Sequence, residues 1–161
     1  MKNKTLYNFL IGKKKNIHGK YIYDIWKYSY EELEDKHNFI QWIFPLKEKS
    51  FNNIFAPTFN NNFEVTKEIK QNMLNSLKIM LSFYGFNFDG IKIQKADNFE
   101  ERKKIYLKPN NHNYKRITRI IKSLKLFGLE EESNLVKETF INLYLEYPEE
   151  IGENTLKYWN L

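Results

Sequence analysis

The apolar residues between positions 66 and 84 recur at the spacing of one face of an α-helix. They are Ile69, Met73, Leu77, Met80 and Tyr84, at steps of four, four, three and four residues. An α-helix turns once in about 3.6 residues, so these side chains form one stripe that other parts of the chain must cover. The pattern predicts a helix over 66–84 that ends at Gly85, where glycine readily adopts a left-handed cap.

Other stretches carry similar signals. Ser29 and Glu32 have the spacing of a capping box, which predicts a helix from residue 30 to about residue 44, before Pro45. The same reasoning predicts helices over 4–11, 98–107, 113–127, 130–147 and 153–159.

Two stretches between these helices lack the helical spacing of apolar residues. Residues 86–93 alternate in polarity about Asp89 and Gly90, which predicts a small hairpin. Residues 47–64 are rich in asparagine and predict a long connection. The 161 residues contain no repeat or dividing linker. We therefore predict an all-α fold with a single domain over residues 1–161, a multi-helix bundle with one small hairpin or extended loop.

Composition limits the class of protein. The chain has no cysteine, which excludes disulfides and thiolate metal sites, and it has no apolar run of the ~20 residues that span a bilayer. We expect a soluble, cytoplasmic protein. Lysine, asparagine and isoleucine are abundant while arginine occurs only at positions 102, 116 and 119, a usage that indicates an AT-rich genome and a bacterial source.

The segment HNFIQWIFPL, residues 37–46, places two polar residues in an apolar run. On the predicted helix, His37 lies on the same face as Leu33 and Ile40, and Gln41 lies one turn above His37. Buried polar groups need hydrogen-bond partners, so these two side chains bond to each other or to the backbone, or else they line a ligand pocket with Trp42.

A second polar stripe lies at the start of the helix predicted over 113–127. His112, Arg116 and Arg119 follow one another at steps of four and three. In a chain that mostly uses lysine for positive charge, this pair of arginines favours a role for the planar guanidinium, which binds carboxylates through two parallel hydrogen bonds. The alternative is that the arginines pair with acidic residues such as Glu34 or Glu130.

The formal net charge of +6 raises the possibility of a nucleic-acid partner. A contact surface would come from the basic face of the same helix, with Lys115, Arg119, Lys122 and Lys125. The alternative is an ordinary solvated surface.

No pattern indicates catalysis. The three histidines lack the spacing of metal ligands on adjacent turns, and no phosphate-binding glycine loop or known catalytic motif occurs. We therefore expect no metal, no cofactor and no catalytic residue. An enzyme of unknown chemistry is the third possibility, after binding module and nucleic-acid binding.

Three segments together resemble the conserved region of the opioid growth factor receptor family. They are LEDKHNFIQWIFPL (33–46), MLSFYG (80–85) and HNYKRITRIIKSLKLFGLE (112–130). The order and approximate spacing are similar to the family pattern, and weaker similarity extends from Leu6 to about Trp159. The resemblance implies a receptor-type binding domain, since the named animal protein is a receptor for a pentapeptide, and it implies no catalytic residue. Together with the residue usage, it leads us to expect a bacterial-type member of the family.

The leading hypothesis is a non-enzymatic binding domain. In it, the stripe of His37 and Gln41 approaches the stripe of His112, Arg116 and Arg119. Together with Trp42 they would form a pocket for a small anionic ligand or a peptide terminus.

Overall fold

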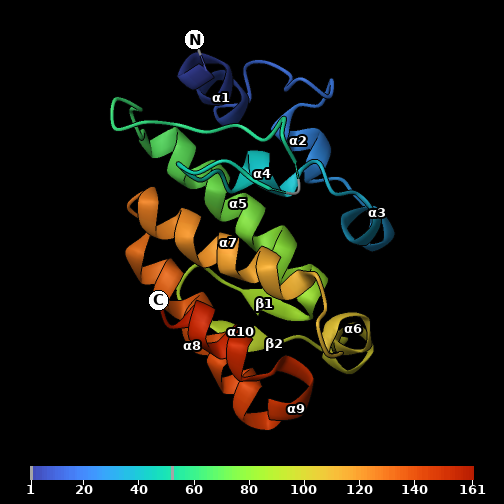
Figure 1. Cartoon of the computed structure of the whole chain (residues 1–161). Helices are drawn as coiled ribbons and strands as arrows, with labels where there is room; N and C mark the ends of the chain where they lie inside the picture. The colour runs from blue at the N-terminus through green and yellow to red at the C-terminus, as the bar shows by residue number, and fades with distance from the viewer. Residues whose placement is uncertain (1, 52) are drawn as a thin grey trace. The chain divides into compact units, whose positions relative to one another are not determined.

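The computed structural model describes residues 2–51 and 53–161, and it is mostly helical with one small antiparallel hairpin (Figure 1). In chain order the elements are α1 (Lys2–Leu10), α2 (Ile22–Ile25), α3 (Tyr30–Asp35), α4 (Ile40–Ile43), α5 (Lys67–Tyr84), β1 (Phe86–Phe88), β2 (Ile93–Lys95), α6 (Phe99–Tyr106), α7 (Asn113–Leu126), α8 (Glu130–Glu146), α9 (Pro148–Ile151) and α10 (Glu153–Trp159). Among the described residues, no helix is both long and apolar enough to cross a membrane.

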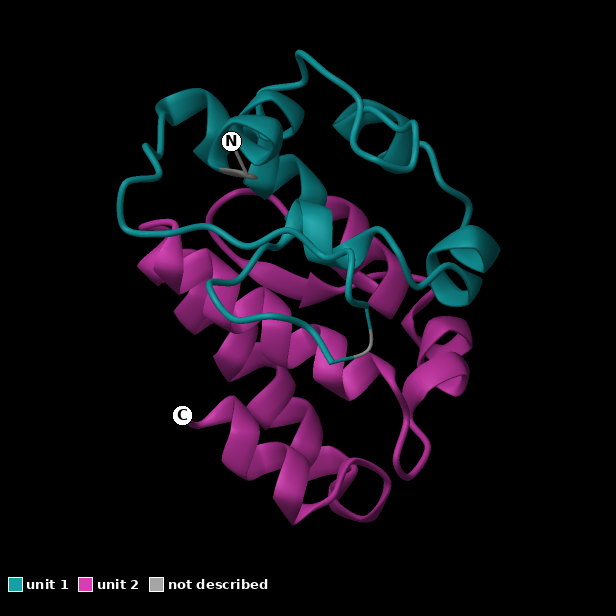
Figure 2. Ribbon diagram, turned by 45° about the horizontal axis from the view of Figure 1, so that its top comes forward, with its two compact units in different colours: residues 1–77 teal, residues 78–161 magenta. Residues whose placement is uncertain are grey.

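The chain divides into two compact units, coloured separately in Figure 2. Unit 1 is Met1–Leu77 and unit 2 is Lys78–Leu161, so helix α5 contributes residues to both. This division reflects the contacts within each unit, and it does not test whether the two units form one domain. The predicted single domain over 1–161 therefore stays a prediction.

In unit 1, helix α1 packs against α4, and Phe9 meets the ring of Trp42 edge-on at 5.3 Å. Two hydrogen bonds from side chains fix the part of α5 that belongs to unit 1. Asn72 Nδ2 donates to the carbonyl of Leu10 at 2.7 Å, which satisfies a carbonyl at the end of α1. The indole N–H of Trp26 donates to Ser76 Oγ at 2.8 Å. The fully buried Ile69, Met73 and Leu77 belong to the predicted α5 stripe, so its core-facing role is confirmed.

The predicted helix over 30–44 is wrong as a continuous element. Its start is confirmed, because Glu32 N donates to Ser29 Oγ at 3.1 Å and Ser29 N donates to Glu32 Oε1 at 3.2 Å. The helix then ends, and Lys36 is extended at φ −83° and ψ 134°. Every residue from Ile40 to Phe44 is buried. One straight amphipathic helix would expose part of that run, whereas a break followed by the short α4 buries all of it.

In unit 2, helices α7, α8 and α10 pack on one another. The predicted α7 residues Ile117 and Leu124 are fully buried, as are Val136 of α8 and, almost completely, Trp159 of α10. Buried polar atoms are paired: Ser133 Oγ donates to the carbonyl of Ile121 at 2.7 Å, and Trp159 Nε1 donates to the carbonyl of Tyr114 at 3.3 Å. The helices predicted over 113–127, 130–147 and 153–159 are confirmed. Pro148 begins the short α9, as an N1 proline can.

The hairpin predicted after Gly85 is confirmed. Phe86 pairs with Lys95 and Phe88 with Ile93 in antiparallel register. In the turn, the carboxylate of Asp89 accepts hydrogen bonds from the backbone N–H groups of Ile91 and Lys92, both at 2.8 Å. These two bonds, with that of Lys92 the stronger influence, lower the pKa of Asp89 because they favour its charged form.

Candidate functional site

A buried polar network surrounds Arg116 in unit 2. The Arg116 side chain on α7 is only 6 % exposed, and its Nη1 donates to Asn113 Oδ1 at 3.4 Å. The same oxygen accepts from the hydroxyl of Tyr84 at 3.1 Å. Asn113 is held from the other side, since its backbone N and its Nδ2 donate to Asn111 Oδ1 at 2.9 and 3.0 Å. We call these residues the Tyr84–Asn113–Arg116 network.

Tyr84 is itself fixed by aromatic packing. Its ring meets those of Phe83, Tyr106 and Phe140 at centroid distances of 5.0, 5.0 and 5.6 Å. The hydroxyl of Tyr106 donates to the Tyr84 carbonyl at 2.7 Å, and burial raises the pKa of Tyr106. A guanidinium stays charged at any ordinary pH, so the network positions a fixed positive charge within unit 2.

The other two residues of the predicted α7 stripe differ in environment. Arg119 is partly exposed, whereas His112 is exposed and occupies the position before the first residue of α7. The ring Nε2 of His112 lies 3.5 Å from Asn113 Nδ2, at the edge of the network. The structure therefore places Arg116 at the amide oxygen of Asn113 and His112 near its amide nitrogen. The ligand-binding role of these residues stays a prediction.

In unit 1, Gln41 and Trp42 lie on α4 and are 6 % and 3 % exposed. Gln41 Nε2 donates to the backbone carbonyl of His37 at 3.2 Å, so the predicted backbone partner exists. Two atoms on adjacent residues, Gln41 Oε1 and Trp42 Nε1, are buried without a hydrogen-bond partner among residues 2–51 and 53–161. One of these atoms is an acceptor and the other is a donor.

The prediction of a buried His37 is wrong. His37 is exposed and lies between α3 and α4, outside any helix. The break in the predicted helix is the reason, because a side chain that follows the extended Lys36 no longer shares the face of Leu33. Leu33 is buried as predicted.

The composition of the network was only partly predicted. Arg116 came from the arginine argument, whereas Asn113 and Tyr84 were not proposed as site residues. The available signal was their place in the segments that carry the family resemblance, at 80–85 and 112–130. Asparagine is also a weak helix former, so its burial at the first turn of α7 indicates a hydrogen-bonding role.

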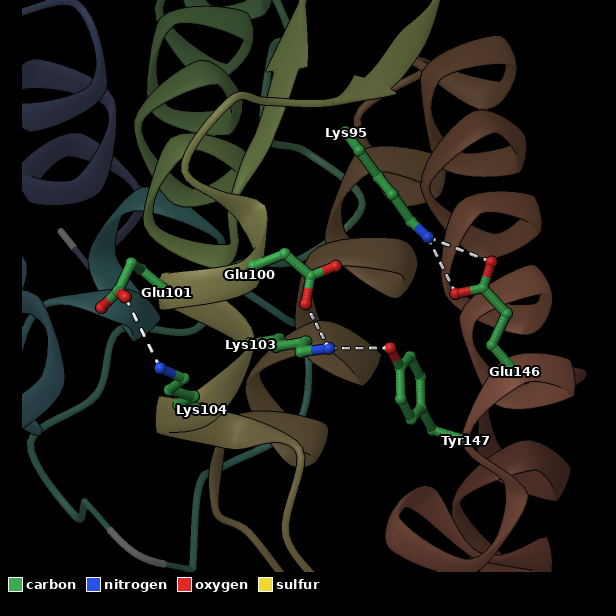
Figure 3. Close-up of polar contacts among 7 residues, drawn as sticks. All are labelled: Lys95, Glu100, Glu101, Lys103, Lys104, Glu146 and Tyr147. Atoms are coloured by element: carbon green, nitrogen blue, oxygen red, sulfur yellow. Dashed lines mark hydrogen bonds and ion pairs between the residues drawn. The ribbon is translucent and has the colours of Figure 1, made fainter.

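Two groups of basic side chains in unit 2 differ in their ion pairs. Around α6, lysines are paired with acids (Figure 3). Lys95 contacts both carboxylate oxygens of Glu146 at 3.0 and 2.8 Å, and Lys104 reaches Glu101 at 3.5 Å. Lys103 contacts Glu100 and donates to the Tyr147 hydroxyl at 3.1 Å. The hydrogen bond with Glu100, and then that with Tyr147, raise the pKa of Lys103.

On α7, by contrast, Lys115, Lys122 and Lys125 are exposed and form no ion pair within the described part of the chain. With the partly exposed Arg119 they make up the predicted basic face. We call these four residues the α7 basic face.

Comparison with known proteins identifies the family. The model of the opioid growth factor receptor conserved region matches residues 1–160. An opioid growth factor receptor-like protein 1 of Xenopus tropicalis is 36 % identical over 137 residues, 81 % of this chain and 25 % of that protein. The mouse protein of the same name is 40 % identical over 129 residues, 74 % of this chain and 27 % of that protein. The rat opioid growth factor receptor is 38 % identical over 121 residues, 70 % of this chain and 21 % of that protein.

The chain therefore belongs to the opioid growth factor receptor conserved-region family. It spans about a quarter of the length of these curated relatives. They are vertebrate proteins, so they lend no support to the expected bacterial source. No solved structure matches the chain.

Proposed function

We propose that the chain is a non-enzymatic binding domain whose ligand is a peptide terminus or another small anionic molecule. The relatives are named as receptors and not as enzymes, which supports a binding role. The residues proposed for ligand binding remain His37, Gln41 and Trp42 in unit 1, and His112, Arg116 and Arg119 in unit 2. A cytoplasmic location is part of the proposal, in keeping with a sequence that uses no cysteine.

One observation carries the peptide part of the proposal. Gln41 Oε1 and Trp42 Nε1 are a buried acceptor and a buried donor, on adjacent residues, without partners in the described chain. Leaving such groups unpaired costs on the order of 1 to 3 kcal/mol each. A peptide unit offers one N–H and one C=O, the two complementary groups. A ligand that supplies both would recover that free energy on binding.

The anionic part rests on unit 2. The Tyr84–Asn113–Arg116 network orients a guanidinium through Asn113 Oδ1, and a guanidinium held in this way is suited to a carboxylate. Arg119 and His112 lie on the same helix or just before it. The C-terminus of a peptide carries such a carboxylate at neutral pH.

The test is a thermal-shift screen of pentapeptides with free carboxyl termini, followed by calorimetric titration of the peptides that bind and of their amidated copies. We expect free peptides to bind more tightly than amidated ones. Trp42→Phe removes the indole N–H and should weaken binding by about tenfold. Arg116→Lys keeps the charge but loses the planar guanidinium, and should weaken the binding of the free peptides by a similar factor.

Trp26→Phe is the matched control, because it loses the same atoms and breaks the bond to Ser76. This control should lower the melting temperature and leave peptide affinity unchanged. A screen without any binding peptide would contradict the proposal. Peptide affinity that Trp42→Phe and Arg116→Lys both leave unaltered would contradict the assigned residues.

A second candidate function is nucleic-acid binding. It is favoured by the exposure of Lys115, Lys122 and Lys125 on α7, where they can approach a phosphate backbone.

A further inference from the structure

Unit 1 contains a pocket of about 220 Å³ that none of the residues of the proposed function lines. Among its lining residues we call His18, Lys20, Lys36 and Asn38 the polar side, and Ile25, Tyr28 and Phe39 the apolar side. A water molecule occupies about 30 Å³ in the liquid, so the pocket has room for a molecule several times larger than water.

Asn16 holds the polar side in place. Its side chain is 6 % exposed, and its Oδ1 accepts from the backbone N–H groups of His18 at 2.9 Å and Lys20 at 3.1 Å. Its own N–H donates to the Lys20 carbonyl at 2.8 Å, and the turn is completed by Gly19 at φ +74°. His18 and Lys20 therefore extend from a closed turn whose backbone is fixed before any ligand arrives.

His18 lines this pocket, and its ring has an unpaired atom. Its Nε2 is buried and has no hydrogen-bond partner among the described residues. Lys20 and Lys36 line the same pocket, and the described lining residues include no carboxylate. Ring N–H and ammonium groups donate hydrogen bonds, and an oxyanion accepts several of them.

The apolar side is largely buried and partly aromatic. Ile25 and Phe39 are 0 % and 1 % exposed, and Phe39 meets the ring of Tyr28 edge-on at 5.7 Å and 89°. Lys36 Nζ lies 5.6 Å from the centre of the Tyr28 ring, so the charged and the aromatic side of the pocket adjoin. A ligand that suits both sides carries a multiply charged oxyanion on an apolar or aromatic group.

We propose that this pocket binds a small phosphate monoester. The phosphate oxygens accept hydrogen bonds from His18 Nε2 and from the ammonium groups of Lys20 and Lys36. The organic group packs on Phe39 and Tyr28. A phosphate monoester carries close to two negative charges at neutral pH, which matches the two lysines better than the single charge of a carboxylate does.

Phenyl phosphate is the probe, titrated into the intact chain at low ionic strength by calorimetry and by ¹H–¹⁵N NMR. We expect saturable binding and a shift of the His18 Nε2 resonance. Inorganic phosphate should bind at least roughly fivefold more weakly than phenyl phosphate, because it lacks the ring. Benzoate should also bind more weakly, and phenol should not bind.

Four variants locate the site. Lys20→Gln and Lys36→Gln should each weaken the binding of phenyl phosphate by about tenfold, since each change removes a charged hydrogen-bond donor. His18→Phe keeps a ring but removes Nε2, and should weaken binding by a similar factor without lowering the melting temperature. Lys13→Gln is the matched control, an exposed lysine of the same unit outside the lining, and should leave affinity within about twofold.

Three results would overturn the proposal: no binding of phenyl phosphate at millimolar concentration, losses in Lys20→Gln and Lys36→Gln no larger than in Lys13→Gln, or an unshifted His18 resonance at saturation. Equal affinity for inorganic phosphate and phenyl phosphate would overturn the assignment of a monoester. Because the pocket excludes Gln41, Trp42 and Arg116, these results are independent of the peptide screen.

Discussion

At the scale of single residues, two glycines with nearly the same φ angle have different surroundings. Gly85 and Gly90 have φ angles of +92° and +93°, the left-handed region that other residues rarely adopt. A Cβ on Gly85 would lie 2.9 Å from the Cα of Phe99 and 3.0 Å from the Cβ of Arg102, whereas a Cβ on Gly90 would meet nothing within 4 Å. Gly85 is therefore required both by its φ angle and by the close approach of α6.

This difference predicts unequal losses of stability. Gly90→Ala should lower the free energy of unfolding by about 1 kcal/mol, the cost of the left-handed conformation alone. Gly85→Ala should lower it by roughly 2 to 4 kcal/mol, because the new methyl group also displaces backbone atoms that cannot rotate away. Urea unfolding of both variants measures the difference, and equal losses would mean that α6 shifts without cost.

At the scale of elements, the α7 basic face can be tested by its dependence on salt. If Lys115, Lys122 and Lys125 neutralise phosphates, each Lys→Gln change should lower the slope of log affinity against log salt by nearly one for duplex DNA and by somewhat less for single strands. Lys157→Gln on α10 is a control with the same loss of charge. Filter binding over about 50 to 200 mM salt measures the slope, and no retention at the lowest salt would remove the nucleic-acid candidate.

The elements that were predicted correctly are those whose signal is local. The stripe on α5 and the capping box at Ser29 depend on residues within one or two turns of each other. The break between α3 and α4 was missed because its cause is burial of the whole run from Ile40 to Phe44, which only the tertiary fold decides. The helical period cannot distinguish a buried short helix from one face of a long helix.

The candidate sites show the same limit. Arg116 was found from its residue type, but its partner network depends on Tyr84, which lies 29 residues from Asn113 in sequence. The pocket lined by His18, Lys20 and Lys36 was not predicted at all, because its lining comes from three separated stretches that have no shared motif. Contacts between distant residues leave no periodic signal in a single sequence.

At the scale of the whole molecule, helix α5 joins the two compact units without interruption, from Lys67 to Tyr84. The apolar stripe continues through the boundary at Leu77, with Met73 buried on one side and Met80 on the other. A helix whose two halves serve different cores links the stability of one core to that of the other, since melting either half exposes the end of the other half.

We therefore expect one cooperative unfolding transition, in agreement with the predicted single domain over 1–161. Differential scanning calorimetry should give equal calorimetric and van't Hoff enthalpies. Ser76→Ala removes the acceptor of the Trp26 indole in unit 1 and should lower the single melting temperature without splitting the transition. Two resolved peaks, with only one shifted by Ser76→Ala, would show that the units unfold independently.

The distribution of the tryptophans gives each unit its own optical label. Trp26 and Trp42 belong to unit 1, and the third tryptophan, Trp159, belongs to unit 2. Trp159 is 1 % exposed and its indole donates to the Tyr114 carbonyl, so its emission reports on the packing of α10 against α7. The chain thus carries native fluorophores by which the loss of structure in either unit can be followed without an attached dye.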